Sequence, residues 1–122
     1  MTAREQYDRL IEPLRAVARS CGYALAVHGT LERDVDLIAV PWTNHASSAS
    51  VLAEAIRNEA ERICLYCRIG DCEAGALQPE FFNGGCPGMK PHGRMVWSLM
   101  LGGGSYLDLS VMPVSPGGSE AF

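Results

Sequence analysis

Three aspartates have the residue type and the surroundings of metal ligands. Asp34 and Asp36 are separated by one residue in an otherwise apolar segment, and Asp108 lies between Leu107 and Leu109. Alternate residues of a strand point to the same face, so the first two carboxylates are expected to lie side by side. Two like charges on a largely buried strand repel and are poorly solvated. A cation that prefers oxygen ligands, such as magnesium, manganese or calcium, relieves both problems. We therefore expect the chain to bring these three carboxylates together.

A structural explanation of the same pair is also open. Asp34 can close a turn, and Asp36 can be a carboxylate at the end of a hairpin that pairs with Arg33. A single Asp-x-Asp pattern does not distinguish this arrangement from a metal site.

The elements around the pair follow from hydrophobic runs and turn residues. Apolar runs predict strands over residues 23–28 and 34–40, with a turn from Gly29 to Arg33 between them. The apolar neighbours on both sides of Asp36 indicate that the second strand is buried. Pro41 cannot donate a ladder hydrogen bond and is expected to end that strand.

Two helices frame this hairpin. Thr2 and Glu5 have the spacing of a capping box, and apolar residues at helical spacing follow as far as Gly22. Pro13 inside this pattern predicts a kink or an early break. A second amphipathic helix is predicted over residues 49–67, with Ser48 or Ser50 as its cap.

The second half of the chain begins irregularly. Residues 68–94 are rich in glycine and proline, with a short strand or turn expected around 76–82. Apolar runs at 95–101 and 106–112 flank a glycine-rich turn and predict a hairpin. The order indicates an α+β fold, a small mixed or antiparallel sheet with two helices on one face. We expect one domain over residues 1–113 and a flexible C-terminal tail at 114–122.

Composition restricts the function classes. The chain has 122 residues, is 48% hydrophobic and 20% charged, and carries a formal charge of −4. Such a balance is ordinary for a globular domain and gives no global attraction to nucleic acid or anionic membranes. No apolar run is long enough to cross a bilayer, and the polar N-terminus does not resemble a secretory signal. With five cysteines, these features favour free thiols and a cytoplasmic location.

The order of the motifs resembles a known family. His28-Gly29-Thr30, then Asp34-Val35-Asp36-Leu37 and finally Leu107-Asp108-Leu109 are similar to the signature of the DNA polymerase beta type of nucleotidyltransferase. The helix–strand–strand–helix framing is similar too. The resemblance implies a nucleotidyltransferase-like fold and the transfer of a nucleotidyl group from a nucleoside triphosphate to an acceptor hydroxyl.

The resemblance also implies roles for individual residues. Asp34 and Asp36 would hold two divalent ions, Mg²⁺ or Mn²⁺. Asp108 would ligate one metal and help to deprotonate the attacking hydroxyl. Gly29 and Thr30 would hold the triphosphate, because a residue without a Cβ lets phosphate approach backbone N–H groups. In-line displacement at phosphorus requires that the attacking and leaving oxygens both be stabilised, as two metals can do.

The chain departs from the family in one respect. Members usually have a longer insert between the Gly-Ser pair and the aspartates, whereas here only Leu31, Glu32 and Arg33 intervene. Arg33 and a basic cluster at Lys90, His92 and Arg94 could supply positive charge to phosphates. No second domain is apparent to bind a base or an acceptor, so a protein partner or a homo-oligomer would supply that surface.

Cysteines suggest a second kind of site. Cys64 and Cys67 have the CxxC spacing, and the later Cys72, Cys86 and His92 could complete a four-ligand zinc site. Against zinc, the first two cysteines fall on the apolar face of the second predicted helix, where a free thiol behaves as a small hydrophobe.

Three functions therefore stand at this stage. The first is a minimal metal-dependent nucleotidyltransferase. The second is a catalytically degenerate protein of the same fold, possibly encoded by a phage or mobile element, that acts by binding a protein partner. The third is a small module stabilised by zinc.

Overall fold

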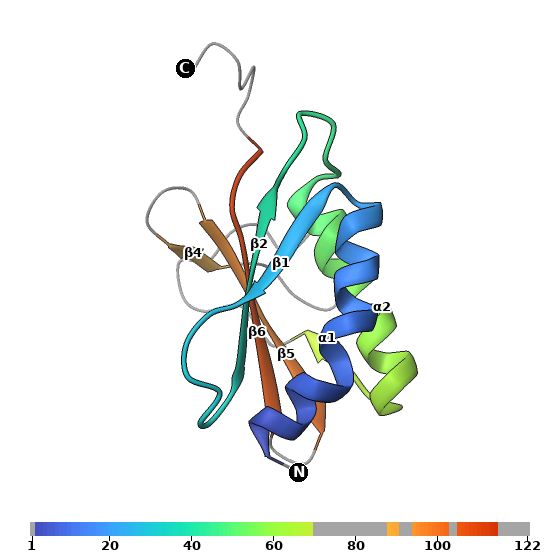
Figure 1. Cartoon of the computed structure of the whole chain (residues 1–122), viewed down its shortest axis with the longest axis vertical. Helices are drawn as coiled ribbons and strands as arrows, with labels where there is room; N and C mark the ends of the chain where they lie inside the picture. Colours follow the sequence, from blue (N-terminus) through green and yellow to red (C-terminus); the bar gives the residue numbers. More distant parts are fainter. Residues whose placement is uncertain (1, 70–87, 91–93, 103–104, 115–122) are drawn as a thin grey trace.

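The computed structural model describes residues 2–69, 88–90, 94–102 and 105–114. Within these residues, two helices and six strands follow one another (Figure 1). The elements in order are α1 Ala3–Ser20, β1 Tyr23–Val27, β2 Val35–Pro41, α2 Ala49–Cys64, β3 Arg68–Ile69, β4 Gly88–Lys90, β5 Arg94–Gly102 and β6 Ser105–Val111.

The strands form one mixed sheet in the order β1-β2-β6-β5-β3, with β4 also paired to β5. β2 and β6 run parallel, whereas the other pairs are antiparallel. Both helices lie on the same side of this sheet (Figure 1). The predicted α+β class, with a small mixed sheet and two helices on one face, is therefore confirmed.

The core lies between the helices and the sheet. Each long strand contributes alternate residues to it, as a sheet covered on one face requires. On the strands these buried side chains are Tyr23, Leu25, Val35, Leu37, Ala39, Trp97, Leu99, Leu101, Leu107, Leu109 and Val111. The intervening residues point to the face that no described helix covers. Asp36 and Asp108 belong to this second set, whereas Asp34 precedes β2 and is not part of the strand as predicted.

The first helix begins as the sequence predicts and ends at Ser20, close to the expected limit at Gly22. Thr2 accepts a hydrogen bond from the Glu5 backbone, and the Glu5 side chain accepts one from the Thr2 backbone. The early break expected at Pro13 is wrong, because α1 continues to Ser20. The missing N–H of a proline costs one helical hydrogen bond. The burial of Leu10 and Leu14 on either side of it offsets that loss.

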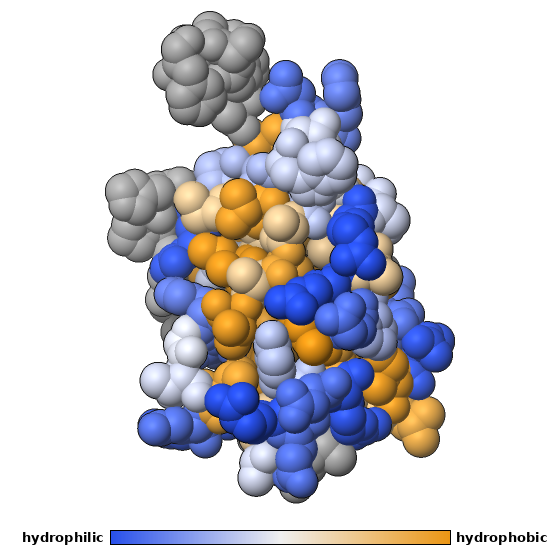
Figure 2. All heavy atoms as spheres, in the orientation of Figure 1, coloured by the Kyte–Doolittle hydropathy of each residue, from blue (hydrophilic) through white to orange (hydrophobic). Residues whose placement is uncertain are grey.

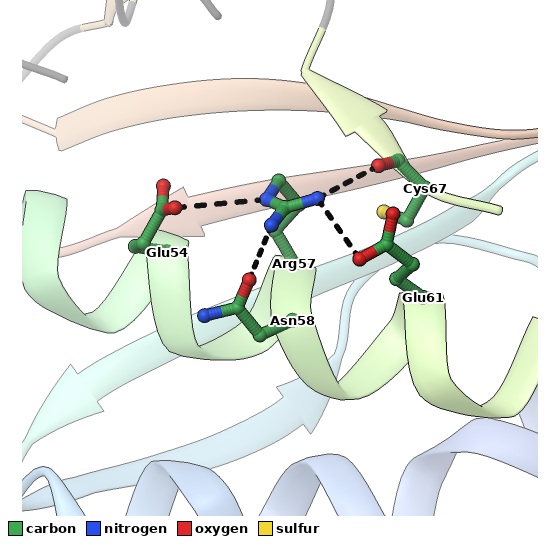
Figure 3. A network of polar contacts seen from close by, with 5 residues as sticks. All are labelled: Glu54, Arg57, Asn58, Glu61 and Cys67. Atoms are coloured by element: carbon green, nitrogen blue, oxygen red, sulfur yellow. Dashed lines mark hydrogen bonds and ion pairs between the residues drawn. The ribbon is translucent and has the colours of Figure 1, made fainter. Parts of the chain in front are cut away.

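The second helix ends three residues earlier than expected. Leu65 adopts the left-handed conformation (φ 62°) that closes α2 after Cys64. Arg57 then fixes the following chain by donating a hydrogen bond to the carbonyl oxygen of Cys67 at 3.0 Å. The same guanidinium contacts Glu54 and Glu61 on α2, so the turn into β3 is anchored to the helix (Figure 3). Cys67 is thus buried beyond the helix, not on its apolar face as predicted.

The remaining sequence predictions are settled as far as the described residues allow. The hairpin of the second half is confirmed as β5 and β6, which pair antiparallel. The expected strand or turn at 76–82 and the tail at 115–122 lie outside the described residues. Val114, the first residue assigned to the tail, is half-buried and packs against the core.

Candidate functional site

Four polar residues form a row across the open face of the sheet. The parallel pairing of β2 with β6 places Asp36 directly beside Asp108. On one side of this pair, β5 places Ser98 opposite Asp108. On the other side, His28 follows β1 and donates its backbone N–H to the Asp36 carbonyl oxygen at 2.7 Å. The two carboxylates, 72 positions apart in the sequence, therefore occupy adjacent strands on one face.

Ser98 holds one carboxylate of the pair in place. Its hydroxyl donates a hydrogen bond of 2.8 Å to Oδ1 of Asp108. The sequence analysis missed this residue. Its position opposite Asp108 depends on an irregularity between Met100 and Gly102, which shifts the register of the β5–β6 hairpin.

The pKa of Asp36 is raised by burial first and by its carboxylate neighbours second. Burial raises the pKa of its carboxyl above the ordinary value of 3.8, hydrogen bonding with Asp108 adds to this, and repulsion from Asp108 and Asp34 raises it further. The His28 side chain opposes the shift. A carboxyl pushed toward its protonated form by neighbouring carboxylates is in a position where a cation restores the charged form.

The tight turn before β2 is built around two residues with positive φ. Gly29 has φ +97°, and a Cβ added to it would lie 3.1 Å from Oδ2 of Asp36. A side chain at this position would therefore press against the carboxylate. Leu31 has φ 62°, a conformation that is uncommon for a bulky residue. Its half-buried side chain packs against the core, which fixes the turn to the rest of the domain.

A pocket of about 330 Å³ opens between this turn and the sheet. The volume is at the lower end of the range for small-molecule sites, about 300–1,000 Å³. Carboxylates dominate its charge, with one guanidinium to attract an anion. The residues that line it are Thr30, Leu31, Glu32, Arg33, Asp34 and Asp36. Five of the seven residues predicted for the site, Gly29, Thr30, Arg33, Asp34 and Asp36, thus lie in this turn or beside it.

The donor set can be tested against a hard divalent cation. Two carboxylates lie side by side, a third lies two residues away on the same pocket, and Asp36 is short of positive charge. Oxygen donors of this kind suit Mg²⁺ or Mn²⁺. Over residues 2–69, 88–90, 94–102 and 105–114, no three His, Cys, Asp or Glu side chains are grouped closely enough to hold an ion. The aspartates therefore suit such an ion by their chemistry, but the described structure does not group three ligands closely enough to hold one.

Lys90 is not brought to this pocket by the strand register. Its backbone pairs with Arg94 at the start of β5, four residues before Ser98. That spacing corresponds to about 13 Å along the strand. Arg33 is the predicted cation that the structure places at the pocket.

The cysteines of the possible zinc site are only partly described. Cys67 is buried, and burial raises the pKa of its thiol to about 12. The Cys64 thiol faces the side-chain oxygen of Gln6 at 3.9 Å. Zinc binds thiolates, so a zinc ion at Cys67 would have to offset the cost of burying the charged form of its thiol. Cys72, Cys86 and His92 lie outside the described residues.

Comparisons with known proteins return one likeness to a solved structure. It is "Terminal uridylyl transferase 4 from Trypanosoma brucei with bound CTP", at 10% sequence identity and a TM-score of 0.42. The match covers 98% of this chain and 41% of that one, so the chain spans about two-fifths of that protein's length. No protein-family model and no curated protein sequence matches the chain.

None of the described helices combines the length and the apolar character that a membrane span needs.

Proposed function

We propose that this protein is a metal-dependent nucleotidyltransferase that moves a nucleotidyl group from a nucleoside triphosphate to an acceptor hydroxyl. The observation that carries the proposal is the parallel pairing of β2 and β6. It places Asp36 next to Asp108 beside a pocket lined by Asp34, Thr30 and Arg33. The motif order that resembles the polymerase beta type of nucleotidyltransferase supports the same chemistry.

Each residue has a role in this proposal. Asp34, Asp36 and Asp108 are the proposed ligands of Mg²⁺ or Mn²⁺, which would stabilise the attacking and leaving oxygens of the displacement. Asp108 would also take part in removing the proton from the attacking hydroxyl. Ser98 would orient Asp108 through the 2.8 Å hydrogen bond to Oδ1.

The triphosphate would be held by the turn before β2. The absence of a side chain at Gly29 leaves space beside the Asp36 carboxylate, where a Cβ would be 3.1 Å from Oδ2. Phosphate oxygens can use that space to approach backbone N–H groups. Thr30 offers a hydroxyl donor and Arg33 offers a guanidinium on the same pocket. Lys90 remains a proposed phosphate contact only if its segment moves, because the register places it further along β5.

Metal-dependent binding of a nucleotide is the direct test. The melting temperature should rise when a nucleoside triphosphate is added with Mg²⁺ or Mn²⁺, and less when the nucleotide is added with a chelator. The matched control is Asp34→Asn with Asp36→Asn, which preserves side-chain size and should abolish the metal-dependent rise. If no triphosphate raises the melting temperature with either metal, the enzymatic proposal fails.

A second proposal is a degenerate protein of the same fold that binds a protein partner. Two observations favour it. Only three residues separate Thr30 from Asp34, and the described residues hold no group of three metal ligands. In that case the Asp34→Asn, Asp36→Asn protein should keep its biological activity and should be more stable, because the substitutions remove repulsion between carboxylates.

A further inference from the structure

The outer edge of β1 has no partner among the described strands. β1 is the first strand of the sheet order, with β2 on its inner side. His28 donates its backbone N–H to Asp36, and Trp42 donates its own to Gly22. In an antiparallel pair, alternate residues direct their backbone groups to the same side. Ala24 and Ala26 therefore bond to β2, whereas Tyr23, Leu25 and Val27 direct their backbone groups to the free edge.

This edge lacks the usual protection against pairing. Its sequence, YALAV, contains no charged residue and no proline, and its pairing with β2 is regular throughout. Natural edge strands commonly carry a charge, a proline or a bulge, because an apolar, unpaired edge readily pairs with another strand. Val27 is 40% exposed at this edge. Arg15 contacts this edge from α1, because its Nε donates a hydrogen bond to the Leu25 carbonyl oxygen at 3.2 Å.

The helix beside this edge carries an ordered stripe of charge. Asp8, Glu12, Arg15 and Arg19 are spaced four, three and four residues apart, so they lie along one side of α1. The contact of Arg15 with Leu25 places this stripe next to the edge of β1. Its N-terminal half is acidic and its C-terminal half is basic. Figure 2 shows the corresponding face, with hydrophobic side chains near β1 bordered by hydrophilic ones toward α1.

We propose that β1 pairs antiparallel with β1 of a second copy of this chain, about a two-fold axis at Ala26. Leu25 of each copy then lies opposite Val27 of the other, and their outward backbone groups form four hydrogen bonds. The sheets of the two copies become continuous, with all helices on one side. The two α1 helices run antiparallel beside each other.

Charge complementarity identifies a second copy as the partner. In this arrangement Glu12 of one copy faces Arg15 of the other, and Asp8 faces Arg19. Both pairs are centred on the same point of α1, between residues 13 and 14. This point lies about 2 Å from Arg15 toward the N-terminus of the helix. The axis at Ala26 lies one residue from Leu25, about 3.3 Å along the strand and in the same direction. The strand register and the helix charges are therefore compatible with the same two-fold axis.

The contacts that Arg15 makes within one chain are exchanged in the dimer. Its guanidinium leaves the Leu25 carbonyl oxygen, which accepts the Val27 N–H of the second copy instead. Its ion pair with Glu12 of its own helix, 3.3 Å between Nη1 and Oε2, is largely exposed. An exposed pair of this kind contributes little, so the exchange has a small cost. The inference does not depend on the proposed catalytic activity, because no residue of the pocket takes part.

The test is the molecular mass in solution of the full chain and of charge-reversed variants, measured by sedimentation equilibrium over a range of concentrations. The wild type should be a dimer. Arg15→Glu and Glu12→Arg should each be monomeric, because each one places like charges across the axis. The double variant carrying both substitutions restores opposite charges and should dimerise again. Because the double variant also restores the ion pair within its own helix, the two single variants are mixed as well. Opposite charges then meet only across the axis, so the mixture should form a dimer that a role confined to one chain would not produce.

A second set of variants tests the strand edge. Val27→Pro removes an N–H that β2 does not use and should weaken the dimer at least tenfold, whereas Val27→Thr should keep it. A monomeric wild type, a double charge variant that stays monomeric, or a dimer unaffected by Val27→Pro would each overturn the proposal. A monomeric wild type that binds an added YALAV peptide would overturn it in favour of a different strand donor.

Discussion

The two faces of the sheet are made by the same strands, residue by residue, yet they differ in what they contain. On β6, Leu107 and Leu109 are fully buried against the helices, while Asp108 between them faces the open side beside Asp36. On β5, buried Trp97 and Leu99 flank exposed Ser98 in the same way. Alternate residues of the same strands therefore serve different ends, since the buried ones stabilise the fold and those between them form the candidate site.

Because the core lies on the other face, the open face can hold carboxylates that repel each other. The carboxylates that raise the pKa of Asp36 reduce stability at neutral pH. The core on the other face compensates for this, because one buried leucine contributes more than an exposed charge pair costs. Substitutions on the two faces should thus change the free energy of unfolding by different amounts and in opposite directions.

The largest difference should come from neighbouring residues of β6. Leu107→Ala leaves a cavity in the core and should lower the free energy of unfolding by about 2–5 kcal/mol. Asp108→Asn, one residue away on the other face, should lower it little or raise it. Urea denaturation followed by circular dichroism measures both. Equal losses in the two variants would show that the open face is as important for folding as the core.

Gly29→Ala should have the next largest effect. The new methyl group meets Oδ2 of Asp36 at 3.1 Å, and the backbone must keep φ near +97°. Backbone strain of this kind costs about 1–3 kcal/mol. The control is Thr30→Ala, which changes an exposed residue of the same turn and should have little effect on stability. A Gly29→Ala protein as stable as the wild type would show that the turn can relax away from the carboxylate.

Asp36→Asn should change stability in the opposite direction. Because the pKa of Asp36 in the folded state is raised, the folded protein binds more protons than the unfolded chain just above pH 3.8. Stability therefore falls as the pH rises through this pKa, and the charged carboxylate destabilises the fold at neutral pH. The variant should melt a few degrees higher than the wild type at pH 7 and show no gain at pH 3.

A pH series of melting temperatures checks this prediction. The control is Glu59→Gln on α2, where a hydrogen bond from Arg62 lowers the pKa of the carboxyl, so that any difference in stability should change with pH in the opposite direction. If the advantage of Asp36→Asn persists unchanged below the ordinary carboxyl pKa, repulsion within the carboxylate row is not its cause.

The contrast between the faces also separates what the sequence predicts from what it does not. Local signals suffice for the helices, the two hairpins and the capping box, because caps, periodicity and turn residues act over a few positions. The parallel pairing of β2 and β6 joins residues 72 positions apart, and no local pattern specifies it. The surroundings of the aspartates and the resemblance to a family both predict that Asp36 and Asp108 meet, and the register places them side by side.

Ser98 shows why part of the site cannot be predicted from the sequence. Gly102 pairs with Ser105, and a regular hairpin continued from that pair would place Leu99 opposite Asp108. The irregularity between Met100 and Gly102 shifts the register by one residue and places Ser98 there instead. A one-residue shift moves every side chain of the strand to the other face. Such a shift depends on packing, which the turn sequence alone does not reveal.

The smallest predicted effect concerns this serine and tests whether it positions Asp108. Ser98→Ala removes the 2.8 Å hydrogen bond to Oδ1 but changes an exposed side chain, so stability should change by no more than about 1 kcal/mol. Mn²⁺ affinity, measured by isothermal titration, should nevertheless fall about tenfold, as is usual when a group that orients a metal ligand is lost. Ser98→Thr keeps the hydroxyl and should restore the affinity. If Ser98→Ala binds Mn²⁺ as tightly as the wild type, the hydrogen bond serves only the pairing of β5 with β6. The open face would then owe its cation affinity to the carboxylates alone.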